Sequence, residues 1–286
     1  MVGIVILTRN RIGDVKECVK SLQRNTYKNK KIIVIDDAIN GGYAKGNNSG
    51  ISRLLRQKCA YILLINDDTV SNPNLISKLV RSFNTDPSIG IVGPTIAYFN
   101  KPNIVWYAGG NLNRLFCFTT HPNMNKNVKY ARTGYTDFVT GCCMIVRNSV
   151  FEDSGLLDTR FEYYFEDAFF CKKALEKGYK SFVIKDVLVR HRVSSTLGNA
   201  GTNSMTPLRA YYFARNPFII IRDEKSLLLK CTQLLGQLFL RLPYHMIHIL
   251  YSGQLQSINW YLKGLSEGLW YLLGGGLLNH QSKKIK

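Results

Sequence analysis

Short runs of apolar, β-branched residues alternate with amphipathic segments in the N-terminal part of the chain. Val2–Leu7, Ile32–Ile35 and Tyr61–Ile65 are continuous apolar runs, a pattern typical of parallel strands that are covered on both faces. Between the first two runs, the apolar residues of Val15–Leu22 share one helical face and lysines lie on another. This alternation predicts an α/β fold with a mainly parallel sheet and helices on both sides.

The middle of the chain continues this pattern less regularly. We expect a helix over roughly Asn74–Phe83 and another around Asp167–Lys177. Strand-like pieces follow at Phe182–Ile184 and Val187–Val189. Between the two helices, Tyr98–Arg132 is rich in Asn and aromatic residues and has no clear period, which indicates long loops and hairpins over the sheet.

From about Leu208 the pattern changes to helices with apolar stripes. One stripe runs over Cys231–Leu242, and Pro243 is expected to break that helix. A second stripe covers Leu255–Leu272. Neither offers the ~20 uninterrupted apolar residues of a spanning helix, so we expect amphipathic helices on a membrane surface. The alternative is that these helices pack against the preceding domain or against a second subunit.

Composition and charge narrow the classes of function. The chain has 45% hydrophobic and 20% charged residues, which is typical of a folded globular protein. Its formal net charge of +19 favours anionic partners such as diphosphates, anionic lipids or nucleic acid. The charge is dispersed, and neither a helix-turn-helix nor a zinc pattern is present, so we expect no nucleic-acid partner.

Cysteine usage and the N-terminus indicate the compartment. The seven cysteines include no C-x-x-C pair, and most have apolar neighbours, as free buried thiols do. The apolar run Met1–Leu7 reaches Thr8-Arg9 at once and is too short for a signal peptide. We therefore expect a cytoplasmic protein.

Polar residues follow three of the expected strands directly. They are Thr8-Arg9-Asn10, Asp36-Asp37 and Asn66-Asp67-Asp68. Ligands of an open α/β sheet bind beyond the carboxyl ends of its strands, so these residues should converge on one crevice. The Asn66-Asp67-Asp68 segment is a candidate site for Mg²⁺ or Mn²⁺, which take carboxylate oxygens and bridge to phosphates. The alternative for this segment is an ordinary turn.

Two further segments carry candidate chemistry. Glu166-Asp167 lies among aromatic residues at the start of an expected helix, where an ionised carboxylate is a usable general base. Plain capping of the helix is the alternative. His191 follows the last expected strand and fits three interpretations, namely a metal ligand, a donor to a diphosphate, or a surface histidine.

The segment Gly41–Asn48 is rich in glycine and opens an expected helix, so its backbone could approach a ligand closely. It has neither the P-loop spacing nor G-x-G-x-x-G, which disfavours these two classes of nucleotide site.

Together these segments resemble the family 2 glycosyltransferases with the GT-A fold, in particular their rhamnosyltransferase-like branch. The resemblance covers roughly Val2–Asn216 and keeps the family's order of motifs. The matching segments are Val-Ile-Leu-Thr-Arg-Asn (5–10), Ile-Ile-Val-Ile-Asp-Asp (32–37), Gly-Tyr-Ala-Lys-Gly-Asn-Asn-Ser-Gly-Ile (42–51), Leu-Leu-Ile-Asn-Asp-Asp-Thr-Val (63–70), Val-Thr-Gly-Cys-Cys-Met-Ile-Val-Arg (139–147), Phe-Glu-Asp-Ala-Phe-Phe-Cys (165–171), His191 and Tyr-Tyr-Phe-Ala-Arg-Asn (211–216).

The resemblance implies a Rossmann-like GT-A domain over 1–207 with a mixed sheet flanked by helices, and a helical extension over 208–286 that contacts a membrane surface or a second subunit. It implies a metal-dependent, inverting transferase that moves a sugar from a nucleotide-diphosphate sugar to a hydroxyl group of a glycan or lipid-linked acceptor. The cofactor would be Mg²⁺ or Mn²⁺, and the enzyme would lie at the inner face of an anionic membrane.

The same resemblance implies roles for individual residues. Donor binding falls to Thr8, Arg9, Asn10, Asp36, Lys45, Gly46, Asn47, Asn66 and Asp67, metal binding to Asp68 and His191, base catalysis to Asp167 with Glu166 beside it, and the acceptor pocket to Gly141 and Arg215.

The chain departs from the family at one place. Only Ala38–Gly41 separates the Asp36-Asp37 strand end from the Gly-Tyr-Ala-Lys-Gly motif, where relatives have a further strand and helix. The sheet should therefore lose an element or be rearranged. A catalytically impaired relative that binds a nucleotide or a glycan is the alternative function.

Overall fold

A computed structural model describes residues 1–9, 11–36, 41–193 and 204–277. The chain divides into two compact units. The first contains residues 1–111, 120–162 and 166–193, and the second contains residues 112–119, 163–165 and 194–286.

A mixed sheet is the centre of the first unit. Its main path has the order β2-β1-β3-β10-β5-β11-β4, with β6 paired to β5 and β9 paired to β11. The strands are β1 (Val2–Thr8), β2 (Lys30–Asp36), β3 (Tyr61–Asn66), β4 (Thr69–Ser71), β5 (Ile89–Tyr98), β6 (Lys101–Tyr107), β9 (Gly134–Thr136), β10 (Cys143–Arg147) and β11 (Lys180–His191). The predicted pieces around residues 182–184 and 187–189 are thus one strand, with a register irregularity between Ile184 and Val187.

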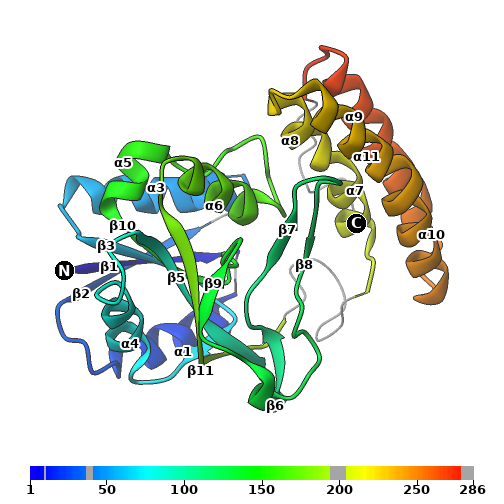
Figure 1. The fold of residues 1–286 in the computed structure, drawn as a ribbon. Coiled ribbons are helices and arrows are strands. Elements are labelled where there is room, and N and C mark those ends of the chain that lie inside the picture. Colours follow the sequence, from blue (N-terminus) through cyan, green and yellow to red (C-terminus); the bar gives the residue numbers. More distant parts are fainter. Residues whose placement is uncertain (10, 37–40, 194–203, 278–286) are drawn as a thin grey trace. The chain divides into compact units, whose positions relative to one another are not determined.

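Helices cover both faces of this sheet (Figure 1), as the alternating pattern predicted. The helices α3 (Tyr43–Arg56), α5 (Asn148–Ser154) and α6 (Glu166–Glu176) lie on one face, and α1 (Ile12–Gln23) and α4 (Leu75–Ser82) lie on the other. The first strand has side chains under both layers: Val2, Ile4, Val5 and Ile6 are fully buried. Burial on both faces explains why β1 is a continuous apolar run rather than an alternating one.

The strand β2 forms one edge of the sheet, in keeping with the short segment that follows it. Among the described strands it pairs with β1 alone, and the side chain of Val34 is 43% exposed. No described strand therefore lies beyond β2 in the sheet.

The register of the strands brings their polar ends to one edge of the sheet. β1 pairs in parallel with β2 and β3, so that Thr8 lies opposite Asp36 and Leu7 lies opposite Asn66. β10 runs antiparallel to β3 with Cys143 opposite Ile65, which places the turn before β10 at the same edge. The end of β11 arrives there as well, because His191 pairs with Thr69 of β4.

The described part of the second unit consists mainly of helices. It also contains residues 112–119 of a hairpin formed by β7 (Asn111–Asn113) and β8 (Phe118–Thr120). Its helices are α7 (Pro207–Arg215), α8 (Pro217–Asp223), α9 (Leu227–Gly236), α10 (Leu242–Tyr251) and α11 (Ser257–Leu272). Two buried glutamines of this unit hold the tip of the hairpin. The Nε2 atom of Gln233 donates to the carbonyl of Arg114 at 2.8 Å, and that of Gln237 donates to the carbonyl of Phe116 at 2.8 Å.

The prediction that Pro243 breaks the helix was wrong. Helical structure runs without interruption from α9 through a π-helical turn, Gln237–Arg241, into α10, and Pro243 lies in the first turn of α10. A proline lacks the N–H of the regular helical ladder and its ring crowds the preceding turn. The wider π-helical turn before it accommodates both effects and keeps the chain helical.

No helix in the described part of the chain combines the length and the apolar composition that crossing a lipid bilayer requires.

The packing of α11 on α7 gives a first testable prediction. A Cβ atom at Gly264 would lie 2.2 Å from the backbone carbonyl oxygen of Tyr211, which cannot move without shifting α7. We expect Gly264→Ala to lower the free energy of unfolding by about 1–3 kcal/mol through overpacking, measured by thermal or denaturant unfolding.

The matched control is Gly13→Ala in α1, where a Cβ atom meets nothing within 4 Å. This change should be neutral or stabilise the protein by up to ~1 kcal/mol, because alanine favours the helix. Equal effects of both substitutions would contradict the close packing of α11 on α7.

Candidate active site

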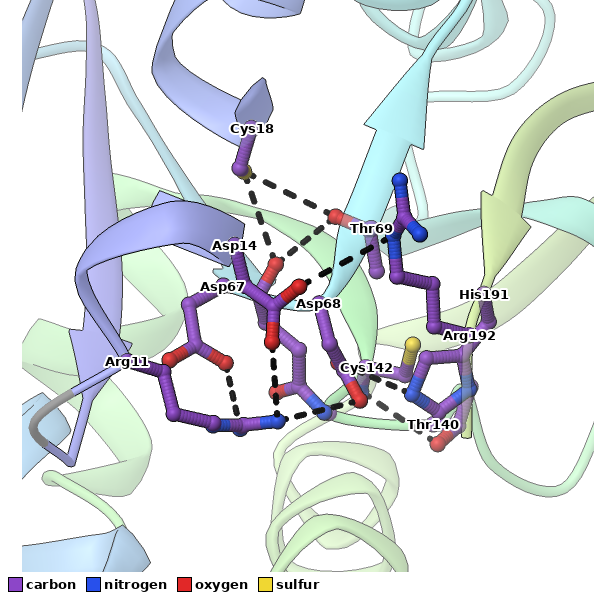
Figure 2. A network of polar contacts seen from close by, with 12 residues as sticks. Arg11, Asp14, Cys18, Asp67, Asp68, Thr69, Thr140, Cys142, His191 and Arg192 are labelled. Atoms are coloured by element: carbon purple, nitrogen blue, oxygen red, sulfur yellow. Dashed lines mark hydrogen bonds and ion pairs between the residues drawn. The ribbon is translucent and has the colours of Figure 1, made fainter. Parts of the chain in front are cut away.

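Two buried carboxylates follow β3 at the converging edge. The side chains of Asp67 and Asp68 are 1% and 4% exposed, and both point toward the guanidinium of Arg11, which comes from the segment between β1 and α1 (Figure 2). Nη2 of Arg11 lies 2.5 Å from Oδ1 of Asp67, and Nη1 lies 3.5 Å from Oδ2 of Asp68. Arg11 thus supplies the positive charge that two buried carboxylates require.

His191 contacts the second carboxylate from the end of β11. Its Nε2 atom lies 3.0 Å from Oδ1 of Asp68, and the backbone N–H of Arg192 donates to the carbonyl of Asp68 at 3.0 Å. The indole of Trp106 meets the imidazole edge-on, with 4.3 Å between the ring centroids. Strand pairing and this aromatic contact therefore fix the imidazole beside Asp68.

The negative charge of this edge belongs to the carboxylates and not to the neighbouring thiols. Burial raises the pKa of the Cys18 thiol to about 12 and holds that of Cys142 far above its ordinary value, and the nearby carboxylates add to both shifts. Burial also raises the pKa of Asp67, while Arg11 and the hydroxyl of Thr8 act in the opposite direction. The two thiols therefore remain protonated and neutral at physiological pH.

The donor set at Asp68 suits a hard divalent cation. Mg²⁺ and Mn²⁺ are commonly held by one or two carboxylates, with waters and substrate phosphates completing the coordination. Asp68 and His191 offer a carboxylate oxygen and an imidazole nitrogen 3.0 Å apart. Within residues 1–9, 11–36, 41–193 and 204–277, no group of three or more His, Cys, Asp or Glu side chains is arranged to hold a metal ion by itself. The residues present fit a cation that a phosphorylated substrate helps to hold.

Asp167 lies at the N-terminus of α6, and backbone N–H groups orient its carboxylate. Gly141 donates to its Oδ2 at 2.9 Å, and Ala168 donates to its Oδ1 at 2.7 Å. The phenol of Tyr43 donates to the carbonyl of Gly141 at 2.6 Å and so fixes the turn that carries this donor. Burial raises the pKa of Asp167 above its ordinary value, and these hydrogen bonds to the anion partly offset the shift.

Glu166 differs from its neighbour although both are carboxylic acids. Its side chain is 7% exposed, and Oε2 has no hydrogen-bond partner among the described residues. Burial, and then the charge of Asp167, raise the pKa of Glu166 well above its ordinary value. Glu166 is therefore the neutral member of the pair, and Asp167 is the one that can act as an anion.

The turn at residues 140–142 connects the two acidic centres. Gly141 binds Asp167, while the carbonyl of Cys142 accepts from the N–H of Asn66 at 3.0 Å. The charges of both Asp68 and Asp167 raise the pKa of the Cys142 thiol. Figure 2 shows Thr140 and Cys142 beside Asp68 and His191. The candidate base and the candidate metal ligand thus both lie next to one short turn.

The remaining candidates in the first unit lie at or near the same edge. Thr8 and Asp36 are opposed at the ends of β1 and β2, and Arg9 follows Thr8 directly. Asn10 lies outside the described residues. Asn66 ends β3, and its carbonyl accepts from the hydroxyl of Thr69 at 2.7 Å.

Two of the three candidate residues in α3, Gly46 and Asn47, are buried, and the third, Lys45, is exposed to solvent. A Cβ atom at Gly46 would lie 2.4 Å from Cδ1 of Leu7, so this glycine lets α3 approach β1. Asn47 is buried and donates to the carbonyl of Tyr43 at 2.9 Å, whereas Lys45 is exposed.

Arg215 belongs to the second unit and is 1% exposed. Its Nε donates to Oδ1 of Asn216 at 3.0 Å, and its guanidinium lies over the ring of Tyr212. The Nδ2 atom of Asn216 in turn donates to the carbonyls of Tyr163 and Tyr164 at 2.7 and 2.9 Å. Arg215 supports the segment that leads into α6, and its place in an acceptor pocket stays a prediction.

Sequence reasoning missed Arg11 and Tyr43. Arg11 directly follows the predicted Thr8-Arg9-Asn10 cluster. Its position close to a strand end could therefore have indicated it as a site residue. Tyr43 belongs to the glycine-rich segment, but its partner Gly141 is 98 residues away in the sequence. Nothing local indicates that pairing.

The chain is similar to known proteins over most of its length. The model of a family described as "Glycosyltransferase like family 2" matches residues 2–204. The chain is 22% identical over 258 residues to the dTDP-rhamnosyl transferase RfbF of Shigella flexneri. The aligned region covers 87% of this chain and 82% of that protein. It is 30% identical over 146 residues to the low-salt glycan biosynthesis hexosyltransferase Agl10 of Haloferax volcanii. That aligned region covers 49% of this chain and 45% of Agl10.

Solved structures share the fold. The S. aureus TarS 1–349 structure in complex with UDP-GlcNAc has a TM-score of 0.57 at 12% identity over 95% of this chain and 81% of that one. GalNAc-T7 with UDP, GalNAc and Mn²⁺ has a TM-score of 0.54 at 14% identity over 87% and 58%. At these identities the likeness establishes the fold alone, and it confirms the predicted GT-A fold.

The turn between the two acidic centres gives a prediction of its own. A Cβ atom at Gly141 would lie 2.4 Å from the phenolic oxygen of Tyr43, so Gly141→Ala must displace either the turn or the tyrosine. We expect the free energy of unfolding to fall by about 1–3 kcal/mol in a denaturant titration, from overpacking and a weakened buried hydrogen bond.

Gly134→Ala in β9 is the control, since a Cβ atom there meets nothing within 4 Å. It should leave the unfolding midpoint nearly unchanged. A Gly141→Ala protein as stable as this control would show that the turn is not held between Tyr43 and Asp167.

Proposed function

This chain belongs to glycosyltransferase family 2, and from that membership we propose that it moves a sugar from a nucleotide-diphosphate sugar onto a hydroxyl group of a glycan or lipid-linked acceptor, with inversion at the sugar carbon. The observation that carries this proposal is that one short turn, residues 140–142, lies next to both Asp167 and Asp68. A single displacement needs a base on one side of the sugar and charge stabilisation for the leaving group on the other.

The base is Asp167. Its carboxylate is held by the N–H groups of Gly141 and Ala168, which fix its direction without consuming its negative charge. It accepts the proton of the acceptor hydroxyl as the oxygen attacks the sugar carbon. Glu166, protonated beside it, adds no second negative charge and leaves one carboxylate to accept that proton.

The leaving diphosphate is handled at the opposite centre. Asp68 and His191 are the residues that would hold Mg²⁺ or Mn²⁺, and when bound the metal neutralises charge that develops on the departing diphosphate. Thr8, Arg9 and Asp36 lie at neighbouring strand ends, where the proposal places the nucleoside. The likeness to a dTDP-rhamnosyl transferase, and to structures that hold UDP or UDP-GlcNAc, makes dTDP and UDP sugars the first donors to test.

Asp167→Asn gives the direct test of the base. The amide is nearly isosteric but cannot accept the proton, so we expect kcat to fall by about 10²–10⁴-fold while donor binding, read from thermal stabilisation by nucleotide-sugars with Mn²⁺, is retained. Asp186→Asn, which removes a carboxylate from an exposed ion pair with Lys78, is the control and should keep normal turnover.

The pH profile of the wild-type enzyme follows from the same residue. Because burial raises the pKa of Asp167 above 3.8 and the base acts as an anion, kcat/KM should fall as the pH drops through this raised pKa.

Normal turnover by Asp167→Asn would exclude the residue as base. Donor binding by the wild type without any transfer would instead favour a catalytically impaired binding protein.

The helices of the second unit support a membrane-associated location at the cytoplasmic face. The unit exposes several large apolar side chains: Leu227 (75%), Leu228 (73%), Phe239 (70%), Tyr251 (92%) and Leu273 (82%). Lys225, Lys230 and Arg241 are interspersed with them. Apolar side chains with basic neighbours suit the interface of an anionic bilayer, and the chain as a whole carries a formal net charge of +19. A homodimer contact is the alternative for the same residues.

Vesicle binding tests this location. In the full chain, Leu227→Gln with Leu228→Gln should reduce cosedimentation with vesicles of phosphatidylglycerol and phosphatidylcholine by about tenfold, because two exposed anchors are lost. Leu175→Gln replaces a leucine of α6 that is 44% exposed, and it should leave vesicle binding unchanged.

Cosedimentation that does not respond to the double substitution would count against membrane docking by α9. A change from dimer to monomer in the same double variant, measured by sedimentation, would assign these residues to a subunit contact instead.

A further inference from the structure

The guanidinium of Arg11 lies where a metal cation would contact Asp67 and Asp68. It contacts Asp67 at 2.5 Å and Asp68 at 3.5 Å, and a third carboxylate, that of Asp14, lies 3.7 Å from the same side chain. Figure 2 shows Arg11 and His191 reaching Asp68 from two sides. The carboxylate predicted to bind a metal is therefore already in contact with a positively charged side chain.

Arg11 is held incompletely. Of its contacts to the buried pair, only the one to Asp67 has hydrogen-bond geometry, and its Nε is buried without a hydrogen-bond partner among the described residues. A guanidinium binds carboxylates and phosphates most strongly through two parallel N–H bonds, which the present arrangement does not achieve. The side chain of Arg11 is 22% exposed, against 1% for Asp67, so it can reach solvent while the carboxylates cannot.

Charge balance makes the guanidinium and a divalent ion competitors. Asp67 and Asp68 together carry two negative charges when ionised, and both carboxylates are buried. A divalent ion alone would neutralise the pair. A divalent ion and Arg11 together would leave an excess positive charge at the buried pair, which is unfavourable, because the third carboxylate, Asp14, is 26% exposed and already pairs with Arg192.

We propose that Arg11 occupies the cation position of the acidic pair in the free enzyme, and that the donor diphosphate draws it away so that metal and nucleotide bind with positive coupling. This inference rests on the proposed function, because it assigns the diphosphate and the metal to the same strand ends. The diphosphate offers Arg11 the two-pronged anionic partner that Asp67 and Asp68 do not.

The coupling has a required thermodynamic form. The metal alone must displace Arg11 from Asp67 and Asp68 without giving it a new partner, so its affinity for the free enzyme is reduced. When the diphosphate is bound, Arg11 has already left Asp67 and Asp68, so the metal binds without having to displace it. By linkage, each ligand then increases the affinity of the other by the same factor. Removing the guanidinium should therefore strengthen binding of the metal alone and weaken the coupling.

The experiment measures Mn²⁺ binding by electron paramagnetic resonance of the free ion, without and with saturating UDP or dTDP. It requires no acceptor and no turnover. In Arg11→Ala we expect Mn²⁺ alone to bind at least about tenfold more tightly than in the wild type, within the range usual for coupling between sites. With nucleotide present, that advantage should shrink to less than about threefold.

Four variants make the result specific. Arg11→Lys keeps a positive charge and should bind Mn²⁺ alone as weakly as the wild type. Arg11→Gln removes the charge but keeps a polar side chain, and it should show the gain expected for Arg11→Ala if the alanine variant fails to fold. Arg192→Ala removes a guanidinium at the same edge that pairs with Glu17 and Asp14 but makes no ion pair with Asp67 or Asp68, and it should change Mn²⁺ affinity by less than about threefold. Asp68→Asn should abolish the binding in every background.

The outcomes separate this inference from the proposed function. Equal Mn²⁺ affinities for wild type, Arg11→Ala and Arg11→Lys, all lost in Asp68→Asn, would overturn the competition while leaving the metal site intact. An equal gain for Arg11→Ala and Arg192→Ala would overturn it too, because a general charge effect would explain both. If Mn²⁺ bound to no protein even with nucleotide, the metal assignment of the proposed function would fail instead.

Discussion

The parallel register of β1, β2 and β3 is the constraint on which the site depends. Thr8 lies opposite Asp36 and Leu7 lies opposite Asn66, so polar residues far apart in the sequence end at one edge of the sheet. The antiparallel strand β10 brings the turn at 140–142 to that edge, and β11 brings His191. A shift of one residue in any of these pairings would turn every side chain of the strand to the other face. The buried apolar runs that fix the register therefore also fix the positions of the acids.

The acidic residues that this register brings together differ in their charge partners and in their protonation. Asp67 and Asp68 are buried and are balanced by Arg11, which makes their edge a place for cations. Asp167 is given N–H donors by Gly141 and Ala168, whereas Glu166 has an oxygen without a partner and a strongly raised pKa. The same residue type is thus a candidate cation ligand in one environment and a candidate base in another, because burial and hydrogen bonding set the protonation state of each.

Much of the fold could be predicted because it depends on local patterns. The apolar run of β1 and the periodicity of α1 indicated a parallel sheet with helices, and the strand-end positions of Asp36 and Asp68 indicated the active edge. The contacts that fix the site could not be predicted, since Tyr43 meets Gly141 across 98 residues and Arg11 meets Asp67 across 56. Pro243 shows the other limit: its local propensity to break a helix was overridden by a π-helical turn that sequence periodicity does not reveal.

We infer that a metal-bound diphosphate and a basic carboxylate act on one sugar from opposite sides of the turn at 140–142. The most direct test is the anomalous diffraction of Mn²⁺ in crystals grown with the nucleotide-sugar that stabilises the protein most. We expect an anomalous peak about 2–2.5 Å from a carboxylate oxygen of Asp68, with the diphosphate on the ion and the sugar carbon facing Asp167. A peak bound to other residues, or a sugar that lies away from Asp167 while the ion is at Asp68, would contradict it.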